Sequence, residues 1–138
     1  MTDEELLAAA EECRTNAYAP YSGFAVGAAL LAADGRVFPG CNLENAAYSA
    51  TCCAERAAFS RAVSEGARDF LKIAVVGGPA GAPVSRFCMP CGVCRQVMRE
   101  FCRGDFTVLT TDGREIRRRT LAGLLPDSFA ADALGGDR

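Results

Sequence analysis

Four cysteines and one glutamate stand in two short segments, TCCAERAAF (51–59) and MPCGVCRQ (89–96). In the second segment Cys91 and Cys94 follow Pro90, and their spacing of three residues places both thiols on one side of the first turn of a helix. The unpaired backbone N–H groups and the positive dipole end of a helix N-terminus favour thiolate over thiol. Thiolates are ligands for zinc. The two segments therefore predict a metal site that contains no histidine.

Cys53 is expected to begin a helix of its own and to gain the same stabilisation of its thiolate. Two helix N-termini that converge on one point would supply three sulfurs, from Cys53, Cys91 and Cys94. Three protein ligands leave the fourth tetrahedral position of zinc open, which is the catalytic arrangement rather than the structural one. Cys52 is not expected to be a ligand, because successive residues entering a helix point about 100° apart.

Two charged residues follow Cys53 in the same predicted helix. Glu55 would reach the open side of the metal, where a carboxylate can take a proton from a water molecule and return it to a leaving group. Arg56, three positions after Cys53, lies on the same helix face. Its guanidinium would offset the excess negative charge of a zinc ion with three thiolate ligands.

Other interpretations of the cysteines stay open at this point. A CxxC spacing also occurs in redox pairs and in structural zinc sites. A structural site would need a fourth ligand, such as Cys52 or Cys88. Cys88 either contacts the metal ligands without binding the metal itself, or takes no part in the site. Cys13, Cys41 and Cys102 are expected to be small buried hydrophobic residues.

The composition bounds the class of protein. The 138 residues are half apolar and carry a formal net charge of −2, which predicts one globular domain over residues 1–138. The mild acidity argues against a nucleic-acid partner, and the basic run 114–119 is expected to be a solvated face. The acidic N-terminal stretch does not resemble a signal peptide, and no stretch reaches the roughly 18 uncharged apolar residues that span a bilayer. We therefore expect no membrane contact and a cytoplasmic location, where thiols stay reduced.

The elements that must position the thiols are predicted from the hydrophobic pattern. Residues 3–18 have helical spacing, with Thr2 or Asp3 as N-cap and Pro20 as the stop. An Asp-Gly turn between 24–32 and 36–42 predicts a hairpin whose second strand, with Pro39, carries a bulge or lies at an edge. Further helices are expected over 53–65, 91–102 and 121–125, and further strands over 71–77, 106–111 and near Ile116. Alternating strands and helices predict helices on both faces of a sheet.

Several segments together resemble one protein family. Cys53-Ala54-Glu55 followed by Pro90-Cys91-Gly92-Val93-Cys94 resembles the zinc nucleobase-deaminase signature in its three-cysteine variant. The segments APYSGFAVGAALL (19–31), GCNLENAAYS (40–49) and LLPDSF (124–129) are similar to further parts of the small homotetrameric cytidine deaminases. The resemblance extends from about residue 16 to 130.

This resemblance implies an α/β fold, a single-domain three-layer α/β/α sandwich with a mixed central sheet of about five strands. It implies one Zn²⁺ per subunit on the three cysteines, with Glu55 as the proton shuttle. It implies that Asn42 and Glu44 bind the ribose hydroxyls and that Phe24 packs against the pyrimidine. It also implies that the backbone of Ala54 meets the polar edge of the base, with the backbone of Cys91 as a second candidate. Ala46, Tyr48 and Phe129 would come from a neighbouring subunit of the homotetramer.

The implied function is the hydrolytic deamination of cytidine and 2′-deoxycytidine to the uridines with release of ammonia, as in pyrimidine salvage. Zinc-bound hydroxide would attack C4, and Glu55 would carry the proton to N3 and then to the departing amine. One alternative is a deaminase of the same fold for a nucleoside antibiotic such as blasticidin S, although Asn42 and Glu44 suit a ribose better. The other is a zinc-stabilised interaction module without turnover, which would have four metal ligands.

Overall fold

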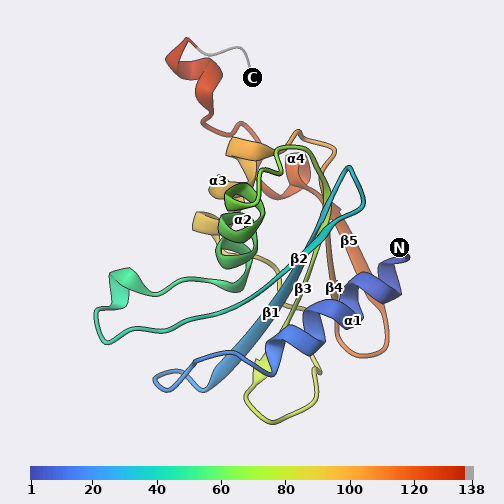
Figure 1. The fold of residues 1–138 in the computed structure, drawn as a ribbon, viewed down its shortest axis with the longest axis vertical. Helices are drawn as coiled ribbons and strands as arrows, with labels where there is room; N and C mark the ends of the chain where they lie inside the picture. The colour runs from blue at the N-terminus through green and yellow to red at the C-terminus, as the bar shows by residue number, and fades with distance from the viewer. Residues whose placement is uncertain (136–138) are drawn as a thin grey trace.

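A five-stranded sheet forms the centre of the structure, a computed structural model that describes residues 1–135 (Figure 1). The strands are β1 (Phe24–Ala32), β2 (Val37–Cys41), β3 (Phe70–Pro79), β4 (Thr107–Thr111) and β5 (Ile116–Thr120). They lie in the order β2-β1-β3-β4-β5. Neighbours β3 and β4 are parallel, and the other neighbouring pairs are antiparallel. The mixed sheet, the edge position of the second strand and the fifth strand near Ile116 are therefore confirmed.

Helices cover both faces of this sheet, which confirms the three-layer α/β/α sandwich (Figure 1). They are α1 (Asp3–Arg14), α2 (Ala54–Ser64), α3 (Gly92–Phe101) and the short α4 (Leu121–Leu124), with 3₁₀ turns η1 (Tyr48–Ala50) and η2 (Ala131–Leu134). Helix α1 packs on one face, and α2 and α3 pack on the other. No helix in the described part of the chain combines the length and the apolar character that a membrane crossing requires.

Two hydrophobic cores lie on the two faces of the sheet, because successive side chains of a strand point in opposite directions. Along β1, Ala28 and Leu30 belong to the core beneath α2 and α3, whereas Ala29 and Leu31 belong to the core beneath α1. Strand β3 alternates in the same way. Strands buried on both faces read as continuous apolar runs, which explains why FAVGAALLA shows no alternation of polar and apolar residues.

The first helix is shorter than predicted, since it ends at Arg14 rather than near residue 18. Tyr18 leaves the helical path because its backbone pairs elsewhere. Its N–H donates to the carbonyl of Asn42, and its own carbonyl accepts from the N–H of Glu44. This tertiary pairing outweighs the local helical pattern. It also ties the segment before β1 to the segment after β2.

Arg14 is buried at the end of α1, with 9% of its surface exposed. Its Nε donates to the carbonyl of Ala25, and its two terminal nitrogens donate to the carbonyls of Pro79 and Ala82, at 2.8–2.9 Å. A buried guanidinium requires such partners, because an unpaired buried charge is costly. Arg14 thereby joins α1 to the start of β1 and to the end of β3.

Two glycines allow the helices to approach the sheet closely. A Cβ atom on Gly27 of β1 would lie 1.9 Å from the carbonyl oxygen of Ala10 in α1. A Cβ atom on Gly40 of β2 would lie 2.5 Å from the carbonyl oxygen of Ala54 and the backbone nitrogen of Ala58 in α2. These are backbone atoms, so a side-chain rotation could not relieve either clash. Position 40 therefore sets how close α2 lies to the sheet.

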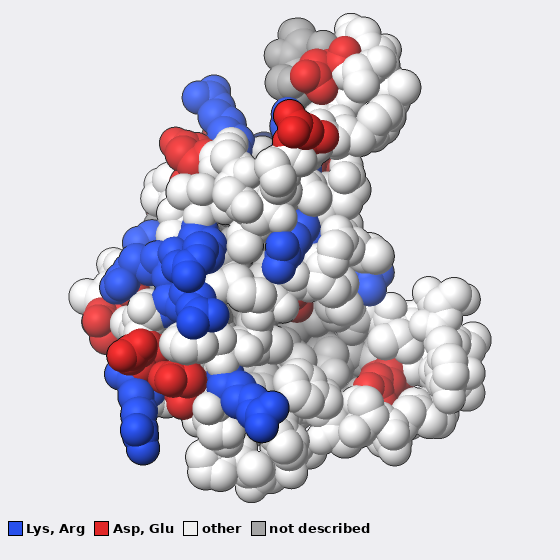
Figure 2. Space-filling view, turned by 180° about the vertical axis from the view of Figure 1, so that it is seen from behind, with Lys and Arg blue, Asp and Glu red and all other residues white. Residues whose placement is uncertain are grey.

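Charged side chains gather on one side of the molecule, where blue and red groups adjoin (Figure 2). Asp3 lies between Lys72 and Arg118, at 2.8 and 2.7 Å. Hydrogen bonds from these two cations lower the pKa of Asp3. The basic run 114–119 forms the turn before β5 and most of β5 itself, and its side chains are half-buried or exposed. It is a solvated edge strand, in agreement with the predicted solvated face.

Candidate metal centre

Three thiols meet where the N-termini of α2 and α3 converge. Cys53 is the N-cap of α2, Cys91 is the N-cap of α3, and Cys94 lies in the first turn of α3. Their sulfurs all lie within 4.8 Å of one another, with 3.9 Å between Cys53 and Cys91 and 3.6 Å between Cys91 and Cys94. Tetrahedral zinc with Zn–S bonds of about 2.3 Å separates its sulfurs by about 3.8 Å. The three thiols therefore fit zinc.

The surroundings of Cys53 favour its thiolate. The hydrogen bond with the Cys94 thiol and the nearby Arg56 guanidinium lower the pKa of Cys53 to about 5, although burial acts in the opposite direction. The terminal nitrogen Nη2 of Arg56 lies 3.5 Å from the Cys53 sulfur and also donates to the carbonyl of Thr51. A ligand that is already a thiolate at neutral pH binds a metal without first losing a proton.

Cys52 lies beside this centre and is not one of the three grouped thiols among residues 1–135. Its thiol contacts the carbonyl oxygen of Cys53 at 3.5 Å, and its backbone pairs with Leu43. Burial raises the pKa of the Cys52 thiol. The two adjacent cysteines therefore differ in the direction of their thiols and in the pKa of those thiols.

Glu55 is buried next to the thiols, with 4% of its surface exposed. Burial raises the pKa of its carboxyl group, and the negative charge of Cys53 acts in the same direction. The carboxyl group therefore holds a proton more firmly than an exposed glutamate does. This property suits a group that takes up a proton and later returns it.

A cavity of about 350 Å³ lies next to the metal centre. Its lining brings together Phe24, Asn42, Glu44 and Ala54, the substrate-contacting residues expected within one subunit, with Cys53, Glu55 and Cys91. The three residues expected from a neighbouring subunit, Ala46, Tyr48 and Phe129, do not line this cavity. Tyr48 is 77% exposed and Phe129 is 60% exposed.

The cavity is also lined by residues that the sequence pattern did not single out, namely Ser22, Val26, Thr51 and Met89, and by Cys52 and Cys88. Cys88 is half-buried, and its backbone N–H donates to the hydroxyl of Thr110 at 3.0 Å. The preceding Phe87 is fixed by Arg117, whose guanidinium lies 3.8 Å from the ring centroid. Cys88 is therefore a wall of the cavity. No regular spacing in the sequence indicates this role.

Asn42 has a structural task as well as a place in the cavity. Its side-chain oxygen accepts from the N–H of Val26 at 2.8 Å, and its side-chain nitrogen donates to the carbonyl of Phe24 at 2.9 Å. An asparagine amide offers two donors and two acceptor lone pairs. One donor and one acceptor site therefore remain for a ligand, while the other two fix the start of β1.

Gly40→Ala is expected to disturb both the fold and the metal centre, because its Cβ would push against the helix that begins at Cys53. Overpacking of this kind lowers the free energy of unfolding by about 1–3 kcal/mol. Zinc content after dialysis should fall as well. Chemical denaturation and metal analysis measure the two effects.

Gly104→Ala is the control, because a Cβ atom at position 104 would meet only the Cβ of Ala122, at 3.2 Å. This variant should retain zinc. Equal zinc loss in both variants would contradict the explanation.

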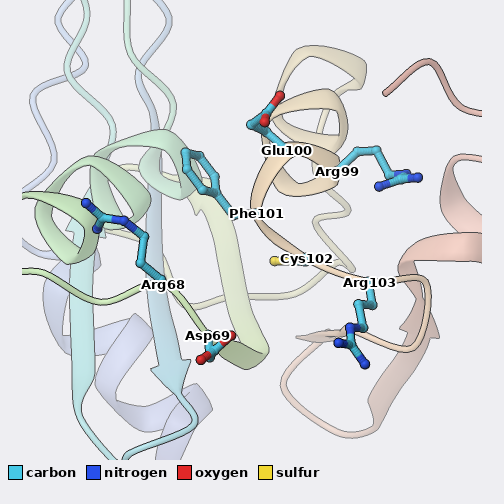
Figure 3. Close-up of a pocket in the computed structure, with 7 residues that line it drawn as sticks. All are labelled: Arg68, Asp69, Arg99, Glu100, Phe101, Cys102 and Arg103. Carbon is cyan, nitrogen blue, oxygen red and sulfur yellow. The ribbon is translucent and has the colours of Figure 1, made fainter. Parts of the chain in front are cut away.

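A larger cavity, of about 530 Å³, lies away from the thiols (Figure 3). It is lined by Arg68, Asp69 and residues 99–103. The guanidinium groups of its three arginines point in different directions (Figure 3), and two acidic side chains share the lining. The grouped thiols of the described chain all lie elsewhere. The smaller cavity is therefore the candidate site.

Comparisons with known proteins agree with this geometry. The sequence profile described as the cytidine and deoxycytidylate deaminase zinc-binding region matches residues 1–110. A cytidine deaminase of Sporosarcina psychrophila is 51% identical over 135 residues, covering 97% of this chain and 96% of that protein. The crystal structure of cytidine deaminase from Burkholderia pseudomallei has a TM-score of 0.84 at 46% identity, covering 94% of this chain and 100% of that one. A blasticidin-S deaminase of Bacillus cereus is less similar, 31% identical over 104 residues, which are 73% of this chain and 74% of that protein.

The fold and the three-thiol centre are thus those of a zinc-binding deaminase. The chain belongs to the cytidine and deoxycytidylate deaminase family.

Proposed function

We propose that the chain catalyses the hydrolytic deamination of cytidine and 2′-deoxycytidine to uridine and 2′-deoxyuridine, with release of ammonia. The observation that carries this proposal is the arrangement of one cavity. Two of the metal-binding thiols, Cys53 and Cys91, line it, and the sulfur of Cys94 lies within 4.8 Å of both. Glu55 lines the same cavity, as do Asn42 and Glu44, whose polar groups can bind hydroxyls. A nucleoside requires a metal centre for its reacting amine and polar groups for its sugar, because the amine and the sugar are at opposite ends of the molecule.

The chemical step depends on Cys53, Cys91 and Cys94, which would hold the zinc ion. When bound, zinc would supply Lewis acidity, which lowers the pKa of a water molecule so that it can lose a proton and act as a nucleophile toward C4 at neutral pH. Glu55 takes one proton of that water and delivers it to N3. It then takes the second proton from the new hydroxyl group on C4 and gives it to the amine, which leaves as ammonia while C4 becomes a carbonyl. Its burial and raised pKa suit both transfers. Arg56 donates to the sulfur of Cys53 and reduces the negative charge that three thiolates bring.

Substrate binding is assigned to the remaining residues of the cavity. Asn42 and Glu44 would hold the ribose hydroxyls, Phe24 would pack against the pyrimidine ring, and the backbone of Ala54 would meet its polar edge. This pair of hydroxyl acceptors favours a ribose over the sugar of blasticidin S. A structural module with four thiol ligands is not supported, since the described residues group three thiols and not four.

We also propose that the protein acts as a homotetramer whose sites are completed by Ala46, Tyr48 and Phe129 of a neighbouring subunit. Leu43 and Tyr48 are exposed on the arm that carries η1, which shows almost no charged side chains (Figure 2). Exposed apolar groups on a projecting arm are typical of a surface that meets a partner. A single catalytic domain over residues 1–138 and a cytoplasmic role in pyrimidine salvage complete the proposal. Sedimentation measures the oligomeric state.

A cytidine assay with and without a chelator tests the function. The loss of absorbance on conversion to uridine should stop after zinc is removed and should resume when zinc is added back, in proportion to the bound metal. Metal analysis should give one zinc ion per chain. Stoichiometric zinc without turnover of either nucleoside would instead favour the structural module, and turnover of blasticidin S alone would favour the antibiotic deaminase.

A further inference from the structure

One hydroxyl group connects two residues of the cavity that are far apart in sequence. The Ser22 hydroxyl donates to Oε2 of Glu44 at 2.5 Å and accepts from the backbone N–H of Phe24 at 3.0 Å. Gly23, with a φ of +68°, forms the turn that brings the Ser22 side chain back toward Phe24. Ser22 thus lies between the residue assigned to the base and the residue assigned to the ribose.

The Glu44 carboxylate is held by three donors. Its Oε1 accepts from the backbone N–H groups of Tyr21 and Ser22, at 2.8 and 3.0 Å, and its Oε2 accepts from the Ser22 hydroxyl. The Ser22 hydroxyl is the largest cause of a lowered pKa for Glu44, followed by the Ser22 N–H. The carboxylate is therefore ionised and fixed in direction, at a half-buried position in the cavity wall.

The hydrogen-bonding capacity of this carboxylate shows what is left for a ligand. Each carboxylate oxygen has two lone-pair sites. Both sites of Oε1 are used by backbone N–H groups, whereas Oε2 keeps one site beside the Ser22 hydroxyl. That free site accepts one hydroxyl donor. Without the Ser22 hydroxyl, Oε2 would lose the one donor that residues 1–135 provide to it. The glutamate side chain would then regain rotational freedom that ligand binding must remove.

We propose that Ser22 is a positioning residue for nucleoside binding, which aims the free acceptor site of Glu44 at a ribose hydroxyl. This inference rests on the proposed function. Ser22 acts through Glu44 and not on the reacting atoms. Its contribution therefore depends on the sugar: a nucleoside with ribose hydroxyls uses the aimed carboxylate, and a nucleoside without them does not.

The test compares cytidine with 2′,3′-dideoxycytidine, which lacks both hydroxyls, in the full-length zinc enzyme. For Ser22→Ala, KM for cytidine should rise about tenfold, the size expected for one hydrogen bond to a charged group. The kcat for cytidine, and the kcat/KM for the dideoxynucleoside, should stay within about twofold of the original protein. Ser22→Thr keeps the hydroxyl and should restore most of the affinity.

Thr15→Ala is the matched control, because it removes a hydroxyl that binds the Glu12 carbonyl at the end of α1. It should leave both substrates unaffected. A double-mutant cycle tests whether Ser22 acts through Glu44. In a Glu44→Gln background, the further change Ser22→Ala should have little effect on KM for cytidine. Equal losses on cytidine and dideoxycytidine, no loss on either, or full additivity with Glu44→Gln would overturn the inference. An original protein that deaminates neither substrate would refute the proposed function itself.

Discussion

Replacing Cys53 with alanine is expected to remove both the zinc ion and the deaminase activity, whereas replacing Cys52 should leave both in place. Cys53 supplies one of three sulfurs that lie within 4.8 Å of one another, and two sulfurs cannot retain a catalytic zinc ion. It is also the sulfur with the lowered pKa and the one that Arg56 contacts. The expected loss of turnover is complete within the detection limit of the ultraviolet assay.

Cys52→Ala is the matched control for this change, because it removes the same atom one position away. Its sulfur contacts a backbone carbonyl rather than the other thiols. Metal analysis and the cytidine assay should be made on both variants, with thermal unfolding in the presence of excess zinc to detect a general loss of fold. If Cys52→Ala lost the metal and Cys53→Ala kept it, the ligand assignment would be displaced by one residue.

Glu55→Gln should keep zinc and lose catalysis. The amide has nearly the shape of the carboxyl group, so the cavity and the three thiols remain in place. It cannot accept a proton from water and return it to the leaving amine, which costs about 10²–10⁴ in kcat. Steady-state kinetics on cytidine and metal analysis on the same sample separate the two properties.

The corresponding control is Glu4→Gln, since Glu4 is exposed in the first turn of α1. It should have the activity of the original protein. A Glu55→Gln protein with a full complement of zinc and nearly unchanged kcat would exclude Glu55 as the proton shuttle. Loss of zinc together with activity would instead mean that Glu55 supports the metal centre and is not primarily a proton carrier.

The metal centre could be predicted from the sequence because its geometry is local. Cys53, Glu55 and Arg56 lie within one turn of α2, and Cys91 and Cys94 lie within one turn of α3. Helical periodicity alone fixes their relative directions. The convergence of the two helix N-termini is a tertiary property, and it was expected only because zinc needs all three sulfurs.

Other parts of the site depend on contacts that no periodicity encodes. Ser22 and Glu44 are 22 residues apart, and their hydrogen bonds form where two irregular segments meet. The end of the first helix differs from the prediction for the same reason. The backbone of Tyr18 pairs with the 42–44 segment and therefore cannot continue the helix. The role of Cys88 as a cavity wall depends on Thr110 of β4, and it too could not be predicted from neighbours in the sequence.

The two edges of the sheet have a consequence for self-association. In an antiparallel pair of strands, hydrogen-bonded residue pairs alternate with pairs that are not hydrogen-bonded. Val26–Asn42 and Ala32–Arg36 are hydrogen-bonded pairs of β1 and β2. Pro39 pairs with Ala29, which is a pair of the other kind, so the backbone groups of Pro39 point away from β1, toward the open edge. Pro39 has no N–H to offer an incoming strand there. On the far edge, a strand that joined β5 would have to strip water from the arginines of its IRRRT sequence. Both sides thus oppose the continuation of the sheet into an aggregate.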